Sequence, residues 1–239
     1  MSDALEACAA AVRRADPDRY FSALFAPADK RPLLLALYAF NHELVRIGES
    51  VREAMMGEIR LQWWRESVEQ AREHRPRAHD VAQALASLFA AVDLPPELFH
   101  AMIDARQFDL LEGSFDGRPA RDAYVDATSG NLMRLAARIL GAEDRFEHLA
   151  REAGAAYGLT GLLRNRAYGH RRVFVADAEA AERDARAHFD IARRSRPGAA
   201  LPAFLPATLV PLYLKNPAKQ VSLHRCQLAL LAAALRGRL

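Results

Sequence analysis

The sequence predicts an all-α protein of eight to ten helices in a single domain spanning residues 1–239. Three observations lead to this fold class. Alanine is very abundant, Ala, Leu, Arg and Glu are strong helix formers, and only 12 Gly and 12 Pro occur in 239 residues. Apolar residues recur at helical spacing, and no stretch alternates as a half-buried strand does. The separators between these segments are short, and none has the composition of a flexible linker.

The predicted helices follow one another with short connections. The first covers residues 3–15 and stops at the "DPD" sequence. The second covers about 30–51 and places Tyr38, Asn41 and Gly48 on one stripe with several leucines. The next ends near residue 74, and further helices are expected at about 78–91, 96–112, 120–140, 143–168, 178–195, 201–213 and 219–236. Only the short "RRVFV" stretch has local β character.

The charge balance is only slightly basic, with 33 Lys+Arg against 30 Asp+Glu and a net charge of +3. Such a balance is compatible with anions or acidic lipid headgroups but requires neither. The aromatic residues are not interleaved with the basic ones, and no helix-turn-helix or RNA-binding signature stands out. We therefore expect no nucleic-acid partner.

The cysteine content and the chain's N-terminal sequence indicate a cytoplasmic protein. Cys8 and Cys226 lie far apart and outside any CxxC motif, as expected for thiols in a reducing compartment. No apolar run approaches the roughly 20 residues of a membrane span, and the first residues lack the apolar core of a signal peptide.

Common metal and phosphate motifs are absent. "HELVR" at 42–46 begins like HExxH but has Arg46 where the second histidine would stand. "GLTGLLRN" lacks the Gly-Lys-Ser/Thr of a phosphate-binding loop. We therefore predict no metal site and no cofactor from these motifs.

One long segment lacks acidic residues. The stretch "LLRNRAYGHRRVFV" at 162–175 contains four arginines and a histidine, and no Asp or Glu occurs between Glu152 and Asp177. Acids are scattered freely through most of the chain, so this segment is a candidate for anion binding.

Several segments, taken in order, resemble the squalene/phytoene synthase superfamily. They are "RYFSALFAPADKRPLLLALYAFNHEL", "EIRLQWWRESVEQ", "AYVDATSGNLMRLAARILG" and "AGAAYGLTGLLRN". The resemblance covers about residues 19–175. It implies the all-α isoprenoid-synthase bundle around a central cavity.

The resemblance also shows what this chain lacks. Enzymes of that superfamily hold Mg²⁺ against a prenyl diphosphate with two Asp-rich motifs on facing helices. At the first motif the aspartates are replaced by Val45 and Arg46, and only Glu49 is acidic. At the second they are replaced by Asn165 and Gly169. Because protein-bound Mg²⁺ usually has one or two carboxylate ligands besides substrate phosphates, we expect no Mg²⁺-assisted ionisation.

One branch of the superfamily shows the same losses. The phrase "LYAFNHELVRIGESVREAMMGEIRLQWWRESVEQ" resembles the mitochondrial complex I assembly factor 6 family. This resemblance implies a non-catalytic role in assembling respiratory complex I, with complex I subunits or the membrane surface as partners. For this chain it implies a cytoplasmic location peripheral to the inner membrane.

Ten residues are candidates to bind a substrate or anion in the cavity. We predict that Arg164, with at least one neighbouring arginine, makes the former metal site an anion-accepting one. The alternatives are packing or surface roles, or an internal ion pair of Arg164 with Glu43 or Glu49. The candidates are Tyr38, Asn41, Arg46, Glu49, Tyr124, Arg164, Asn165, Arg166, Arg171 and Arg172.

Two other functions stay open at this point. An active squalene/phytoene-type prenyltransferase would need Mg²⁺ on other acids, for which Asp104, Asp109 and Glu112 are the nearest set, although we expect them on a solvated face. A protein that binds a lipid or prenyl diphosphate without turnover would need a wide apolar cavity without an acidic rim. A cavity filled by side chains would favour the assembly role.

Overall fold

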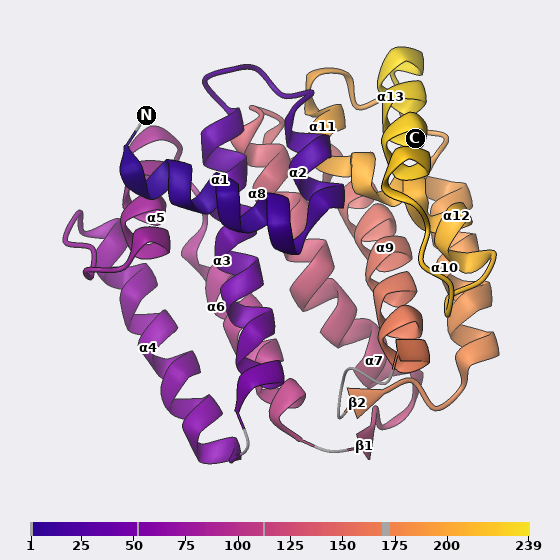
Figure 1. Ribbon diagram of the computed structural model, residues 1–239, viewed down its shortest axis with the longest axis horizontal. Helices are drawn as coiled ribbons and strands as arrows, with labels where there is room; N and C mark the ends of the chain where they lie inside the picture. The colour runs from indigo at the N-terminus through magenta and orange to yellow at the C-terminus, as the bar shows by residue number, and fades with distance from the viewer. Residues whose placement is uncertain (1, 52, 112, 169–172) are drawn as a thin grey trace.

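Two long helices, α3 (Arg31–Ser50) and α9 (Glu147–Tyr168), run through the bundle and carry Val45 and Asn165, the first positions of the two lost motifs. Figure 1 shows the computed structural model, which describes residues 2–51, 53–111, 113–168 and 173–239. Around α3 lie α1 (Asp3–Ala15), α2 (Pro17–Ala23), α4 (Ala54–Arg72), α5 (Asp80–Ala91) and α8 (Asn131–Ile139). Around α9 lie α7 (Gly117–Val125), α8, α10 (Ala178–Ala192), α11 (Leu201–Phe204) and α12 (Val210–Leu214).

The sequence of α3 explains its central place. Residues 33–41 are all buried, so this half of the helix is enclosed on every side rather than on one face. A helix that is apolar all round must lie inside the core. Phe40 lies at an edge-to-face angle to Trp64 of α4, with 5.5 Å between ring centroids, and also packs on Phe99 of α6 (Pro96–Ala105).

The predicted helices are found, with differences where prolines and glycines intervene. The segment predicted as one helix at 201–213 is broken into α11, a 3₁₀ turn at Leu205–Leu209 and α12. Each piece begins next to a proline, which lacks the N–H that would continue the preceding helix. Helix α6 ends at Ala105 in a 3₁₀ turn, Arg106–Leu110, and α13 (Leu223–Arg236) starts later than predicted.

A π-helical turn, Asp126–Gly130, joins α7 to α8 in what the sequence predicts as one regular helix. This turn contacts α9 very closely. A Cβ built on Gly154 of α9 would lie 2.6 Å from Cα of Gly130, so position 154 needs glycine for the two backbones to meet. The contact fixes the distance between α9 and the π turn, and both border the pocket described below.

The short stretch with β character forms the only sheet within the described residues. Strands β1 (Gly113–Ser114) and β2 (Val173–Phe174) pair in parallel, with Gly113 opposite Val173. They join the connection that precedes α7 to the one that follows α9, at the lower edge of the bundle in Figure 1.

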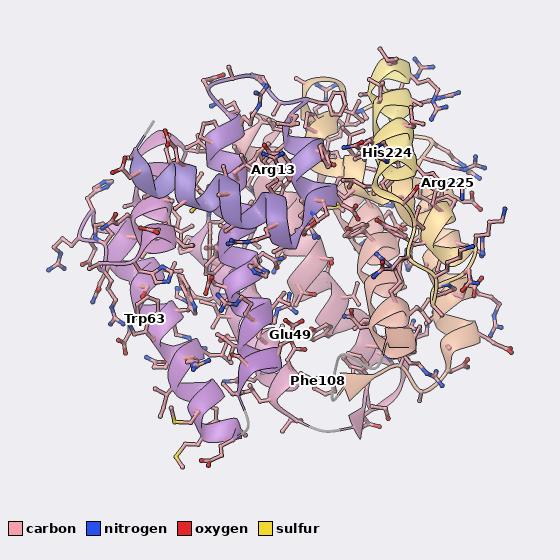
Figure 2. All side chains as sticks on the ribbon, in the orientation of Figure 1. Arg13, Glu49, Trp63, Phe108, His224 and Arg225 are labelled. Carbon is pink, nitrogen blue, oxygen red and sulfur yellow. The ribbon has the colours of Figure 1, made fainter. Side chains whose placement is uncertain are left out.

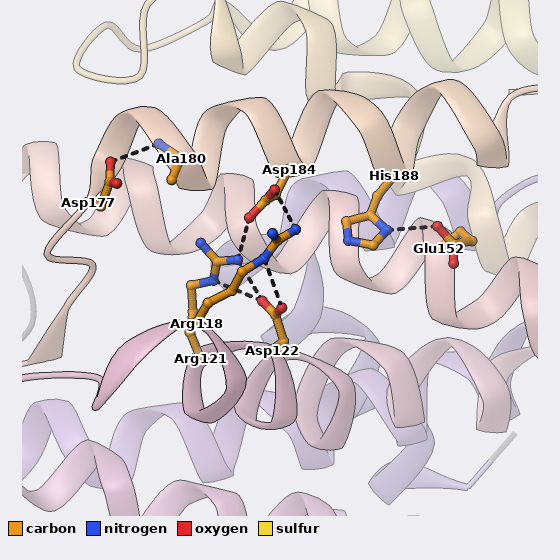
Figure 3. A network of polar contacts seen from close by, with 8 residues as sticks. All are labelled: Arg118, Arg121, Asp122, Glu152, Asp177, Ala180, Asp184 and His188. Atoms are coloured by element: carbon orange, nitrogen blue, oxygen red, sulfur yellow. Dashed lines mark hydrogen bonds and ion pairs between the residues drawn. The ribbon is translucent and has the colours of Figure 1, made fainter.

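A group of ion pairs holds α10 against α7 (Figure 3). Arg121 is buried and donates to Asp184 over 2.5 Å and to Asp122 over 2.7 Å. Arg118 donates to the other oxygen of Asp184 over 2.7 Å. One turn further on, His188 of α10 lies 2.7 Å from a carboxylate oxygen of Glu152 on α9. Arg118, Arg121 and His188 therefore have structural partners that hold α10 in place.

Candidate functional site

A small pocket lies between α3, α7, the π turn and α9, and we call it the central pocket. Its volume is about 140 Å³. Val45 and Asn165, the residues at the first position of each Asp-rich motif, both line it. Asn41 and Tyr124 line it as well. The two helices therefore face each other as the resemblance implies, and four of the positions discussed from sequence meet here.

Much of the space beside these residues is occupied by a buried polar network. Arg106 donates from Nη1 to the hydroxyl of Tyr124 over 2.8 Å and to Asp109 Oδ2 over 3.1 Å. Its Nη2 donates to Asn41 Oδ1 over 3.4 Å, and Tyr124 donates to Asp109 Oδ1 over 2.7 Å. All four residues are less than a tenth exposed. This network ties the end of α6 to α3 and α7 and leaves little room for a ligand.

The network corrects one expectation. Asp109 was predicted to lie on a solvated helix face, but it is buried and paired with Arg106. Asp104 does lie at the surface, where it pairs with Arg65 of α4. Glu112 lies outside the described residues. The three acids therefore do not form one cluster among the described residues, and only Asp109 points inward.

The described residues around the central pocket do not fit a Mg²⁺ site. Val45 offers no ligand atom, Asn165 offers a neutral one, and the carboxylate of Asp109 accepts from Arg106 and Tyr124. Among the described residues, no group of three or more His, Cys, Asp or Glu side chains is placed to hold a metal. Since Mg²⁺ favours carboxylate oxygens, this set of donors is unsuited to it. Gly169 lies outside the described residues.

Two of the candidates on α3 do not line the central pocket. Arg46 is exposed and pairs with Glu43 over 3.1 Å, in a surface groove that α3 forms with Trp63 and Trp64 of α4. Glu49, labelled in Figure 2, is also exposed. Successive helical residues point about 100° apart, so Arg46 cannot share the direction of Val45.

A second and larger pocket, which we call the front pocket, has a volume of about 690 Å³. It lies between the α1–α2 junction, α9, α12 and the start of α13. Arg164 lines this pocket rather than the central one, and its guanidinium lies 3.8 Å from the centroid of the Tyr213 ring. The two acids that the alternative prediction paired with Arg164 are placed elsewhere, because Glu43 pairs with Arg46 and Glu49 is exposed.

A buried carboxylate forms the floor of the front pocket. Asp18 of α2 accepts hydrogen bonds from the hydroxyls of Tyr213, over 2.6 Å, and Tyr157, over 2.9 Å. Burial, followed by the negative charge of Asp16, raises the pKa of the Asp18 carboxyl. The two hydroxyls and the positive charge of Arg164 offset part of this rise. These long-range contacts were missed from the sequence, which offers no local pattern linking Asp18 to either tyrosine.

The tyrosines of this region act as hydrogen-bond donors. Burial and the neighbouring Asp18 raise the pKa of Tyr213, so its hydroxyl stays protonated. Burial likewise raises the pKa of the Cys226 thiol, whose sulfur lies 3.5 Å from that hydroxyl. A protonated thiol is a poor nucleophile. Both tyrosine hydroxyl protons are donated to Asp18, so the front pocket presents the Arg164 cation beside the carboxylates of Asp16 and Asp18.

The remaining candidates have structural contacts. Tyr38 is buried next to Arg19, whose guanidinium lies 5.9 Å from the Tyr38 ring centroid. Arg166 donates to the backbone carbonyls of Val175, over 2.8 Å, and Ala176, over 3.3 Å, and so holds the segment after β2. The last two candidates, Arg171 and Arg172, lie outside the described residues.

The architecture, an all-α single-domain bundle with two facing helices at a central pocket, is that of isoprenoid synthases. The sequence profile of the squalene/phytoene synthase family matches residues 12–175. The chain belongs to this family.

Among curated proteins, the chain is similar to "NADH dehydrogenase (ubiquinone) complex I, assembly factor 6". It is 31% identical to the Bos taurus protein and 30% identical to the Homo sapiens protein, each over 171 residues. Each match covers 70% of this chain and 51% of the relative. The Drosophila melanogaster homolog is 26% identical over 165 residues, which cover 66% of this chain and 49% of that one. The chain thus spans about half the length of the curated relatives that it matches.

Among solved structures, the fold is similar to that of a dehydrosqualene synthase in complex with ligand, with a TM-score of 0.78 and 15% identity. That similarity covers 98% of this chain and 95% of the other. The squalene synthase HpnC from Alicyclobacillus acidocaldarius gives a TM-score of 0.71 and 20% identity, over 98% and 94% of the two chains. These similarities confirm the predicted fold. No helix among the described residues is long and apolar enough to cross a bilayer.

Proposed function

We propose that this chain is a non-catalytic member of the squalene/phytoene synthase family that acts in the assembly of respiratory complex I. The observation that carries the proposal is the content of the central pocket. Where the family's enzymes place carboxylates, this pocket has Val45 and Asn165, and beside them the Arg106–Asp109 pair occupies the interior. The assembly role in the proposal is supported by the similarity to complex I assembly factor 6.

Physical reasoning supports the loss of catalysis in this proposal. Ionisation of a prenyl diphosphate needs divalent cations to stabilise the charge of the leaving group. A pocket of about 140 Å³ is also smaller than the roughly 300–1,000 Å³ of ordinary ligand sites. The side chains that reduce it are hydrogen-bonded to one another, so opening it would break several buried contacts.

The proposal includes complex I subunits as partners and a cytoplasmic location at the periphery of the inner membrane. Both come from the family resemblance and not from the geometry of the site. A fold alone does not define a function, so this part needs a test in the cell.

Deleting the gene in its host is expected to lower the amount of assembled NADH:quinone oxidoreductase and to leave hopanoid and carotenoid levels unchanged. The reason is that loss of an assembly protein lowers the amount of the complex, whereas loss of a synthase lowers the amount of its lipid products. The amount of complex is measured on native gels and by NADH oxidation in membranes, and the lipids by mass spectrometry. Normal complex I together with lost hopanoids or carotenoids would contradict the proposal and favour the prenyltransferase alternative.

A second candidate function, binding of a prenyl diphosphate or other anionic lipid without turnover, is supported by the front pocket. Its volume of about 690 Å³ lies in the range of ligand sites, and Arg164 lines it. A guanidinium pairs with phosphate oxygens through two parallel hydrogen bonds and needs no metal.

Pyrophosphate or farnesyl diphosphate is expected to raise the melting temperature equally with and without EDTA, and Arg164→Ala is expected to abolish the rise. The reason is that each charge-assisted hydrogen bond contributes about 1.5–3 kcal/mol. Arg166→Ala is the matched control, because Arg166 binds backbone carbonyls instead. If neither ligand shifts the melting temperature while Arg164→Ala alone strongly destabilises the fold, Arg164 is structural.

A further inference from the structure

The outer face of the C-terminal helix α13 is apolar where a packed surface helix should be polar. Its inward face is formed by Cys226, Leu230 and Ala233, which are buried. Leu228, Leu231 and Leu235 are three and four residues apart and therefore form a stripe on the opposite side. They are 65%, 44% and 81% exposed. Ordinary helix packing against this chain does not explain these three leucines.

The surroundings of this leucine stripe are cationic. No Asp or Glu occurs in residues 191–239, which contain eight basic residues, Arg193, Arg194, Arg196, Lys215, Lys219, Arg225, Arg236 and Arg238. Arg193 pairs with Asp190 over 2.8 Å. Within the part of the chain that the structure describes, no ion pair joins the other seven to a carboxylate. Their charge is therefore available to an external anionic partner.

Three of these basic side chains converge on one groove. Lys215, Lys219 and Arg225 line a groove of about 470 Å³ beside the first turn of α13, which we call the basic groove. Arg225 is labelled on this helix in Figure 2, and α13 lies at the outside of the bundle in Figure 1. The basic groove and the leucine stripe are thus parts of one surface.

We propose that this surface docks on an anionic phospholipid bilayer, with the leucine stripe in the acyl boundary and the basic groove against headgroup phosphates. The chemistry favours this occupant. An interfacial helix combines exposed large apolar residues with Lys and Arg at its polar edge. Each basic residue near an anionic leaflet contributes attraction that falls off within a Debye length. A second copy of this chain is an outcome that the test separates.

The inference rests on the peripheral membrane location given in the proposed function and deepens it by assigning the surface and the class of lipid, but it does not depend on the assembly role. Membrane docking would hold for a synthase or an assembly protein alike. The experiment below contains neither complex I nor prenyl diphosphate, so its failure and the failure of the proposed function can be told apart.

The test is sedimentation of the full chain with vesicles of phosphatidylglycerol and phosphatidylcholine, and with vesicles of phosphatidylcholine alone. We expect binding to the anionic vesicles, weakened by high salt, and little binding to the neutral ones. The double variant Leu228→Ser/Leu235→Ser should bind at least about tenfold more weakly, because the buried apolar area is lost. The triple variant Lys215→Ala/Lys219→Ala/Arg225→Ala should lose on the order of a hundredfold.

Matched controls use equally exposed residues elsewhere. Met55 and Ile59 of α4 are 66% and 56% exposed, and Met55→Ser/Ile59→Ser should leave vesicle binding unchanged. Arg72→Ala/Arg75→Ala/Arg183→Ala removes the same charge from other surfaces. Circular dichroism and melting curves establish that each variant is folded.

The proposal is overturned if the wild-type chain does not bind anionic vesicles, if it binds neutral vesicles equally well, or if the α13 variants bind as the wild type does. It is also overturned if the chain is a dimer by light scattering that Leu228→Ser/Leu235→Ser converts to a monomer without change in vesicle binding. That last result would assign the leucine stripe to a second copy.

Discussion

Replacing Arg106 with methionine is expected to lower the free energy of unfolding by about 3–5 kcal/mol. Arg106 is buried and donates to Asp109, Tyr124 and Asn41. Methionine fills a similar volume but removes the Arg106 cation from the buried Asp109 carboxylate. The cost is therefore that of a buried carboxylate losing this ion pair, and it is measured by urea unfolding followed by circular dichroism.

A compensating change tests the cause of this loss. In the double variant Arg106→Met/Asp109→Leu the charge is absent, so most of the lost stability should return, since a buried ion pair can often be replaced by apolar residues. Arg65→Met removes the cation from the surface pair with Asp104 and serves as the control, with an expected cost below about 1 kcal/mol. A cost of less than about 1 kcal/mol for Arg106→Met would mean that Asp109 does not depend on this pair.

Gly154→Ala is expected to destabilise the fold by about 1–3 kcal/mol, although alanine is the better helix former. The added methyl group would lie 2.6 Å from Cα and 2.8 Å from the nitrogen of Gly130, and backbone atoms cannot turn aside as a flexible side chain can. Helix α9 would have to move away from the π turn, which changes both walls of the central pocket. Urea unfolding measures the loss.

The same helix provides the control for this substitution. A Cβ on Gly161 meets no atom within 4 Å, so Gly161→Ala should be neutral or stabilise by up to about 1 kcal/mol. If Gly154→Ala and Gly161→Ala changed the free energy of unfolding equally, helix propensity rather than the contact with Gly130 would decide the outcome.

The fold was predictable because its signals are local. Helical periodicity and short separators identified most elements, and prolines account for the breaks that the prediction smoothed over near residues 201–213. The π turn at Asp126–Gly130 was not predictable, since a π turn depends on what packs against it, here the glycine face of α9.

The site was predictable only in part. The resemblance placed Val45 and Asn165 at the first positions of the two Asp-rich motifs, and both line the central pocket. Adjacent residues of a helix point about 100° apart, so Arg46 could have been predicted to lie outside the pocket that Val45 lines.

Other contacts of the site arise from distant segments. Asp18 and Tyr213 are 195 residues apart in the chain, and no pattern in the sequence pairs them. Arg106 and Asp109 lie three residues apart, but their pairing and burial were not predicted, because they depend on how the 3₁₀ turn Arg106–Leu110 packs against α3 and α4.

Loss of Mg²⁺-assisted condensation is tested most directly by incubating the purified chain with farnesyl or geranylgeranyl diphosphate, Mg²⁺ and NADPH. The extract is then analysed for squalene, presqualene diphosphate and phytoene by mass spectrometry, with an active synthase of the same fold as the positive control. We expect no product above the level without protein, because Val45 and Asn165 stand where carboxylates are needed and Arg106 holds Asp109. Clear, protein-dependent formation of any of the three products would contradict the non-catalytic role.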